Sequence, residues 1–242
     1  MENRDIELCL CSKDPIFVEG VPVYPISLQE IAKIGYVKFN AGMRFLCLTA
    51  DDIRIHAGHE IQDDEVFKYL FACCSESEDL REMICSLLSK ITHTKITLLS
   101  HRQVFSCGAF DISRRNFPAI QDVIRLRNGL RNIDEEEENP DNEAARRVLQ
   151  RRKEERLKRR KVKAAEDGND ITISDLVSIM ANGLGMTMHE VMQYDLYQFN
   201  DQFNRLKIMD DYEVSVQALL HGAKKEDVNL THWITKIKRE TE

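Results

Sequence analysis

Residues 171–206 read ITISDLVSIMANGLGMTMHEVMQYDLYQFNDQFNRL and predict that the last part of the chain is helical. Thr172 stands three residues before Asp175, which is the spacing of a helix start, and the apolar residues that follow recur every three or four positions. Thr187 and Glu190 have the same spacing and form a capping box, so a second helix is expected to begin there.

The helical pattern continues to the end of the chain. Asp210-Asp211 predicts the cap of a third helix, and Gly222 has the place of the glycine that ends it. The stretch Asp227–Ile237 again carries apolar residues at helical spacing. Residues 171–242 are therefore predicted to form an all-α domain.

The first part of the chain, residues 1–132, mixes strand and helix signals and is predicted to be an α+β domain. Short apolar runs at Ile6–Cys11 and Ile16–Tyr24 are typical of strands. Lys95–Leu99 and Gln103–Cys107 predict two further strands, which a hairpin would join.

Four helices are expected in the same region. Ser27-Leu-Gln-Glu30 is a capping box, and the helix that follows it is expected to break near Asn40-Ala-Gly42. The other three are predicted at residues 63–74, at residues 77–91, and from about Asn116 onward.

Residues 133–170 join these two regions and are strongly charged. Five consecutive acids, Asp134–Glu138, are followed between Glu143 and Lys163 by eleven Arg or Lys residues and three Glu. Apolar positions are sparse, so this stretch is predicted to be a solvated, helical linker. The predicted fold is thus mostly helical overall: an α+β N-terminal domain, a charged helical linker and an all-α C-terminal bundle.

The basic residues of the linker are the strongest local signal. The candidates for phosphate binding are Arg151, Arg152, Lys153, Arg159, Arg160 and Lys161. Nucleic acid would gain from counterion release at such a run. Glutamates interrupt it, however, acids precede it, and no aromatic residue is available for base stacking. A charged helix that is solvated or that contacts a protein is therefore favoured over nucleic-acid binding.

Composition limits the classes to which the protein can belong. The chain has 242 residues, of which 43% are hydrophobic and 31% charged, with a net charge of −7. This is enough to form a core, and it argues against a general polyanion binder. The seven cysteines lie in the first half, and no apolar leader or membrane span is evident. We expect free thiols in a reducing compartment and no membrane contact.

Signals for metal binding and catalysis are weak. Cys9-x-Cys11 and His56-x-x-His59 occur, but paired Cys-x-x-Cys knuckles do not. Cys107 follows His101 by six residues, and a structural role is favoured over a nucleophilic pair. We expect no metal, no cofactor and no enzymatic activity.

The C-terminal region is rich in methionine and aromatic residues, which are typical of adaptable binding surfaces. Ordinary packing explains most of them. The positions predicted as partner contacts are Tyr197, Phe203 and Trp233, since large aromatic side chains are favoured in interface cores.

Two segments resemble a known group of proteins. Residues 25–40, PISLQEIAKIGYVKFN, resemble the opening helix of tail-associated proteins from bacteriophages with contractile tails. Residues 175–206, with Ala218–Ala223 and Trp233, are similar to the helical C-terminal part of the same group and of phage tail assembly chaperones. The resemblance covers about a third of the chain.

The resemblance implies a role in tail or baseplate assembly, through contact with the tape measure or hub proteins. It implies no catalytic residues, and it places the protein in the host cell cytoplasm or in the virion tail. We therefore expect a non-enzymatic assembly or structural protein that binds other tail proteins and could self-associate. The alternatives are a nucleic-acid-associated protein that uses the basic linker, and a phage effector that binds a host protein.

Overall fold

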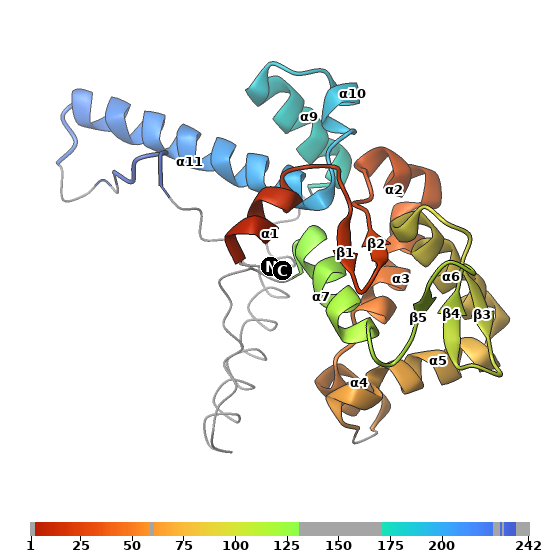
Figure 1. Cartoon of the computed structure of the whole chain (residues 1–242). Helices are drawn as coiled ribbons and strands as arrows, with labels where there is room; N and C mark the ends of the chain where they lie inside the picture. Colours follow the sequence, from red (N-terminus) through yellow and green to blue (C-terminus); the bar gives the residue numbers. More distant parts are fainter. Residues whose placement is uncertain (1–2, 59–60, 131–170, 225–227, 229, 236–242) are drawn as a thin grey trace, which may run out of the picture.

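The computed structural model describes residues 3–58, 61–130, 171–224, 228 and 230–235 (Figure 1). These residues are mostly helical, with a two-stranded and a three-stranded antiparallel sheet in the first part of the chain. The prediction of a mostly helical α+β fold is confirmed. The predicted linker and its six basic candidates, from Arg151 to Lys161, lie outside the described residues. Within the described ranges, no helix has both the length and the apolar character to cross a membrane.

The first sixty residues form a helix, a hairpin and three more helices. Their bounds are α1 (Asn3–Leu10), β1 (Ile16–Val18), β2 (Val21–Val23), α2 (Leu28–Ile34), α3 (Tyr36–Leu46) and α4 (Ala50–Ala57). The capping box at Ser27 is present, with the Glu30 carboxylate accepting from the Ser27 backbone N–H at 3.0 Å. A similar box of Thr49 and Asp52, which the sequence analysis did not identify, starts α4.

The next seventy residues form two long helices, a small sheet and a third helix. Their bounds are η1 (Asp63–Glu65, one 3-10 turn), α5 (Val66–Glu76), α6 (Glu78–Thr92), β3 (Thr97–Leu99), β4 (Val104–Ser106), β5 (Asp111–Ile112) and α7 (Phe117–Arg127). The predicted hairpin is confirmed as the antiparallel pair β3–β4. The two-residue strand β5 adds to it, and was not predicted.

The C-terminal region contains α9 (Ile173–Leu184), α10 (Met188–Val191) and α11 (Leu196–Leu220). The helix starts at Thr172 and Thr187 are confirmed as capping boxes. The expected helix start at Asp210-Asp211 is wrong, because both residues lie inside α11, which is capped by Asp195. No glycine or proline interrupts residues 196–220, so nothing stops the helix at the two acids.

Other local predictions are corrected as well. Ile6–Cys11 was predicted as a strand but belongs mainly to α1, because Ile6, Cys9 and Leu10 meet the core at helical spacing. The helix after Ser27 breaks earlier than expected, at Gly35, whose φ of 92° suits glycine. Residues 230–235 lie in the stretch predicted as a last helix, but they are not helical.

A continuous core underlies the first part of the chain and reaches into the C-terminal helices. At its centre, Phe67 contacts the rings of Phe71, Phe105 and Phe117, at centroid distances of 5.2–6.1 Å. Helix α6 packs against α3, α5, β2 and β3 (Figure 1). Val177, Met180 and Phe199 belong to the same cluster of buried residues.

The C-terminal helices are attached to the body by backbone contacts. The N–H groups of Leu28 and Gln29, at the start of α2, donate to the carbonyl oxygens of Tyr194 and Met192 at 2.8 and 2.9 Å. Ser27 and Asp195 form an isolated antiparallel bridge beside them. Two helix starts, those of α2 and α11, are therefore joined directly. The division into domains at residues 132 and 170 stays a prediction.

Candidate functional site

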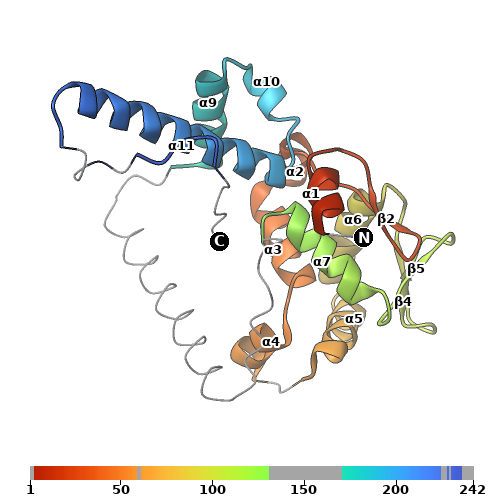
Figure 2. The ribbon, with the colours of Figure 1, turned by 60° about the vertical axis from the view of Figure 1, so that its left-hand side comes forward.

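Helix α11 packs on the body with its first half and extends away from it with its second half (Figures 1 and 2). The residues of its first half that meet the core are Leu196, Tyr197, Phe199, Phe203 and Leu206. Among the described residues, none after Leu206 belongs to this core. The change from packing helix to projecting helix therefore takes place within about one turn after Leu206.

The sequence of α11 explains this change. Leu196, Phe199, Phe203 and Leu206 follow one another at spacings of three and four, so they lie on one face. The positions that continue the same face are Asp210, Glu213, Val214 and Gln217, and all but Val214 are polar. A largely polar face gains no free energy from burial. The second half of α11 is therefore not expected to pack against the rest of the protein.

The contact of α11 with α9 is close at the last packed position. A Cβ atom on Gly183 would come within 2.6 Å of Cδ2 of Leu206, so only glycine fits against that side chain without a shift. The rings of Phe199 and Phe203 are nearly parallel, with centroids 6.4 Å apart. These contacts fix the direction in which α11 leaves the body.

Beyond Leu206 the apolar side chains of α11 move to another face. Met209, Tyr212, Val216 and Leu219 make a second stripe, displaced by more than a third of a turn from the first. The segment of residues 230–235 lies beside this stripe. Nη1 of Arg205 donates to the carbonyl oxygens of Trp233 and Thr235 at 2.6 and 2.8 Å, and the His232 ring lies 5.0 Å from that of Tyr212.

We call residues 207–220, together with residues 230–235, the α11 arm. It exposes large apolar side chains, although it is the part of α11 that leaves the core. Leu220 is 79% exposed and Ile234 is 69% exposed, and Val214, Leu230 and Trp233 are exposed as well. Exposed apolar side chains gathered on a projecting element are typical of a surface that binds another protein.

The base of α11 contains two buried charged side chains. Asp195 is 3% exposed and Arg127, at the end of α7, is 2% exposed. Within the described part of the chain, Oδ2 of Asp195 and Nε of Arg127 are the buried side-chain atoms without a hydrogen-bond partner. Burial raises the pKa of Asp195 to about 6, against the opposing effects of the Gln198 N–H, Arg127, Tyr197 and Lys13.

Arg127 is held in place by backbone oxygens. Its Nη2 donates to the carbonyl of Asp14 at 2.5 Å, and its Nη1 donates to that of Ser12 at 3.4 Å. Burial lowers the pKa of the guanidinium, while the nearby charges of Asp195, Cys9 and Asp14 raise it. The arginine therefore links α7 electrostatically to the start of α11 and to the loop before β1.

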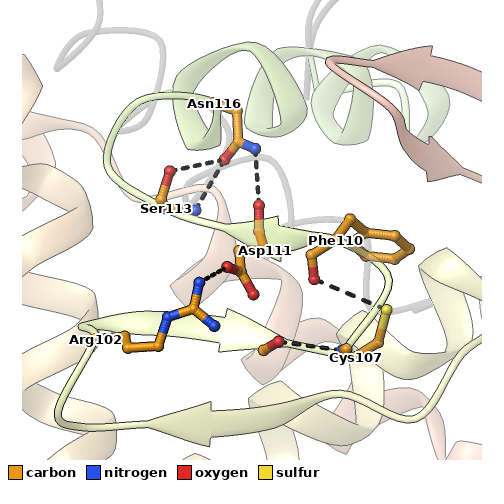
Figure 3. A network of polar contacts seen from close by, with 8 residues as sticks. Arg102, Cys107, Phe110, Asp111, Ser113 and Asn116 are labelled. Atoms are coloured by element: carbon orange, nitrogen blue, oxygen red, sulfur yellow. Dashed lines mark hydrogen bonds and ion pairs between the residues drawn. The ribbon is translucent and has the colours of Figure 1, made fainter.

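A polar network surrounds β5 and the start of α7 (Figure 3). The Asn116 side chain accepts from the Ser113 N–H at 2.8 Å and donates to the carbonyl of Asp111 at 2.9 Å. Arg102 forms an ion pair with the carboxylate of Asp111. These contacts hold the short strand against the start of α7, which is a structural role.

Cys107 and His101, the pair considered for catalysis, lie at opposite ends of β4. His101 is in the turn before the strand, and Cys107 follows it, next to Phe110 (Figure 3). Burial raises the pKa of the Cys107 thiol, but hydrogen bonds from Phe110, Ala109 and Thr94 outweigh it, and the net pKa is lowered. In the described ranges, no group of three His, Cys, Asp or Glu side chains has the arrangement of a metal site.

The three predicted partner contacts have different environments. Tyr197 is 7% exposed and belongs to the core, Phe203 is partly buried beside Phe199, and Trp233 is 39% exposed on the α11 arm. The sequence analysis did not single out Val214 and Leu220. The signal that could have identified them is the end of the first apolar stripe at Leu206, which separates the packed from the projecting half of α11.

Comparison with known families places the α11 arm within a recognised module. Residues 161–238 match the family model described as the YomV second domain. No curated protein and no solved structure matches the chain. The matched range covers about a third of the sequence, and includes α9, α10, α11 and residues 230–235. The C-terminal part of the chain is thus similar to a phage-derived domain family of the SPBeta-like Bacillus phages.

Proposed function

We propose that the protein is a non-enzymatic phage tail or baseplate assembly protein, which binds another tail protein through the α11 arm. The observation that carries the proposal is that α11 leaves the core after Leu206, yet exposes Val214 and Leu220, while Trp233 and Ile234 of the adjoining segment are exposed as well. The similarity of residues 161–238 to a phage-derived family supports a phage context. The resemblance of the same region to tail assembly chaperones supports the more specific role.

The chemistry of the α11 arm suits an amphipathic segment of a partner. Trp233 is held from its backbone by Arg205, so its indole is presented at low entropic cost. Met209 and Tyr212 supply adaptable apolar surface along the helix. A segment of the tape measure or of a hub protein would lie along this surface and bury the exposed leucine, valine and isoleucine side chains.

The test is affinity purification of the tagged protein from cells that produce the phage, with and without nuclease, followed by mass spectrometry. Tape-measure, hub or other tail proteins are expected to be recovered, and to persist after nuclease treatment. The double variant Val214→Glu with Leu220→Glu is expected to lose them, because it charges the exposed apolar surface without touching the core. Ile55→Glu, on α4, is the matched control, since Ile55 is 60% exposed outside the α11 arm.

Other results would contradict the proposal. Protein partners that disappear with nuclease would favour nucleic-acid binding by the basic residues between Glu143 and Lys163. A bacterial protein recovered in place of tail proteins would favour a host-directed effector. Recovery of tail proteins by the Val214→Glu, Leu220→Glu variant would leave the assembly role intact but remove the α11 arm as its site.

A further inference from the structure

Helix α3 exposes an apolar face on the side opposite to its buried one. Phe39, Met43 and Leu46 enter the core, and Gly42 is packed so closely that a Cβ atom there would meet Cδ1 of Leu87 at 2.2 Å. The outward face is formed by Tyr36, Val37, Asn40, Ala41 and Arg44, which follow one another at helical spacing and line an open hollow. We call these five residues the α3 face.

Two large side chains of the α3 face are exposed, although the opposite side of the helix is packed against the core. Val37 is 82% exposed and Tyr36 is 48% exposed. A solvated helix face normally carries charged and polar residues. Apolar side chains gain free energy mainly when they are buried. Valine and tyrosine around a hollow therefore indicate a surface that gains from being covered.

The charge around the α3 face is positive, although the chain as a whole is acidic. Lys33, Lys38 and Arg44 are exposed, and α3 contains no acidic residue. The carboxylate of Glu30, on α2, is taken up by the capping box with Ser27. The ion pairs within the described residues include none of these three cations.

Elsewhere on the described surface, cations are commonly paired with neighbouring acids. Arg54 pairs with Asp51 on α4, and Arg81 pairs with Glu78 on α6. Arg44 thus differs from these two arginines in having no ion pair among the described residues. Positive charge without an ion pair among the described residues, beside exposed apolar side chains, gives the polarity that a partner must complement.

We infer that the α3 face docks an acidic amphipathic helix of another protein, with apolar side chains on Tyr36 and Val37 and carboxylates against Arg44, Lys33 and Lys38. The apolar contacts supply most of the affinity, and the charges fix the orientation of the helix and exclude basic partners. This surface lies on a different element from the α11 arm, and the inference does not rest on the proposed function.

A peptide selection tests the inference without knowledge of the natural partner. The full-length chain is immobilised and presented with an mRNA-displayed library of random peptides of about 16 residues, long enough for four helical turns. Counter-selection uses the double variant Val37→Asp with Arg44→Glu. In this variant an acid replaces the exposed valine, and the positive charge of the exposed arginine becomes negative. The expected winners combine Glu or Asp with Leu, Ile or Phe at spacings of three and four.

The dissociation constants of a selected peptide, measured with single variants of the chain, then separate the contribution of charge from that of apolar contact. Arg44→Glu is expected to weaken binding by about tenfold and to reduce its dependence on salt, since one attractive charge becomes repulsive. Val37→Asp is expected to weaken it at least as much. Ile55→Asp, which alters an exposed apolar residue on α4, is expected to leave it unchanged.

Four results would overturn the inference. One is the absence of any enriched peptide, and another is the enrichment of basic or purely apolar peptides. The third is equal enrichment on the unmodified chain and on the double variant. Binding that develops only after the acids of Asp134–Glu138 are neutralised would assign the α3 face to the chain's own acidic run, and would also overturn it.

Discussion

Asp195 is a buried acidic residue at the start of α11. It caps α11 by accepting from the Gln198 N–H at 2.8 Å, and its backbone pairs with Ser27. Its carboxylate is nevertheless buried, and Oδ2 has no hydrogen-bond partner within the described part of the chain. An ionised carboxylate in such a place is costly, even with Arg127 nearby, because burial removes its hydration.

The pKa of Asp195 determines how stability depends on pH at this residue. In the folded chain the pKa is about 6, compared with an ordinary value of 3.8. The folded state therefore binds this proton more tightly than the unfolded state does. The Asp195 contribution is most favourable below about pH 4 and declines as pH rises to about 6, which amounts to about 3 kcal/mol at neutral pH.

Asp195→Asn is therefore expected to stabilise the protein at neutral pH. Asparagine keeps the cap on α11 but removes the buried negative charge, so the free energy of unfolding should rise by about 1–3 kcal/mol. Urea unfolding at about pH 7.5 and about pH 4.5 measures this. The gain should shrink as pH falls through 6 and approach zero near pH 4.

The matched control is Asp210→Asn, which alters an exposed acid on the same helix. It should change stability by less than about 0.5 kcal/mol at either pH. A loss of stability in Asp195→Asn at neutral pH would mean that the attraction between Asp195 and Arg127 outweighs the cost of burial.

Cysteine reactivity gives a second prediction at the residue scale. Burial raises the pKa of Cys47 and of Cys74 to about 12 in each case, whereas the pKa of Cys107 is lowered. Since the thiolate is the reactive species, Cys107 should be alkylated well before the other two in the native protein near neutral pH. Iodoacetamide labelling with peptide mass spectrometry measures the order, and a faster rate at Cys47 or Cys74 would contradict it.

At the scale of elements, α11 is one helix with two different apolar faces. Its first stripe ends at Leu206 and its second begins near Met209, so no single face is apolar over its full length. The acids at positions 210 and 211, which the sequence analysis interpreted as a helix start, mark this change of face. The pattern that suggested a break in the helix instead marks a break in its packing.

Gly183→Ala tests the contact that directs α11. The added methyl group would come within 2.6 Å of Leu206, so α9 and α11 must separate slightly or Leu206 must change rotamer. Alanine favours the helix by up to about 1 kcal/mol, but overpacking typically costs about 1–3 kcal/mol. Thermal unfolding is expected to show a net loss of stability.

Asn182→Ala provides the comparison, because Asn182 is exposed in the same turn of α9. It brings a similar gain in helix propensity without a contact to Leu206, and should leave stability unchanged or slightly higher. Equal changes of stability in the two variants would show that the Leu206 side chain can shift without cost, and that α9 and α11 are not closely packed at this position.

Helix starts were the elements that could be predicted most reliably. Ser27, Thr172 and Thr187 each satisfy their own backbone within four residues, so their capping boxes do not depend on distant parts of the chain. Ile6–Cys11 was predicted as a strand, but a helix formed because Ile6 and Leu10 then meet the core on one side. Strand β5 has two residues, which is too short for any periodicity.

At the scale of the whole molecule, the C-terminal helices share one cluster of buried residues with the first part of the chain. Val177, Met180 and Phe199 belong to the same cluster as the residues around α6. The backbone bonds from α2 to residues 192 and 194 cross the same boundary. Such a shared core couples the unfolding of the two parts.

Fragments test this coupling. Residues 171–242 alone are expected to lose most of their helical signal and any cooperative transition, because separation exposes Phe199 and the start of α11. Circular dichroism of the fragment, of residues 1–130 and of the full chain makes the comparison. A fragment 171–242 that melts cooperatively, at the temperature of the full chain, would instead support an independent C-terminal domain.

The sequence by itself determined the helix-rich class, several helix starts and the β3–β4 hairpin, because caps, periodicity and turns act over a few residues. The tertiary structure alone decided which apolar residues are buried. Tyr197 entered the core while Val214 and Leu220 stayed exposed, and the α3 face stayed uncovered although its opposite side is packed. Periodicity gives the direction of a face, but burial depends on whether another element reaches that face, and such contacts join residues far apart in the chain.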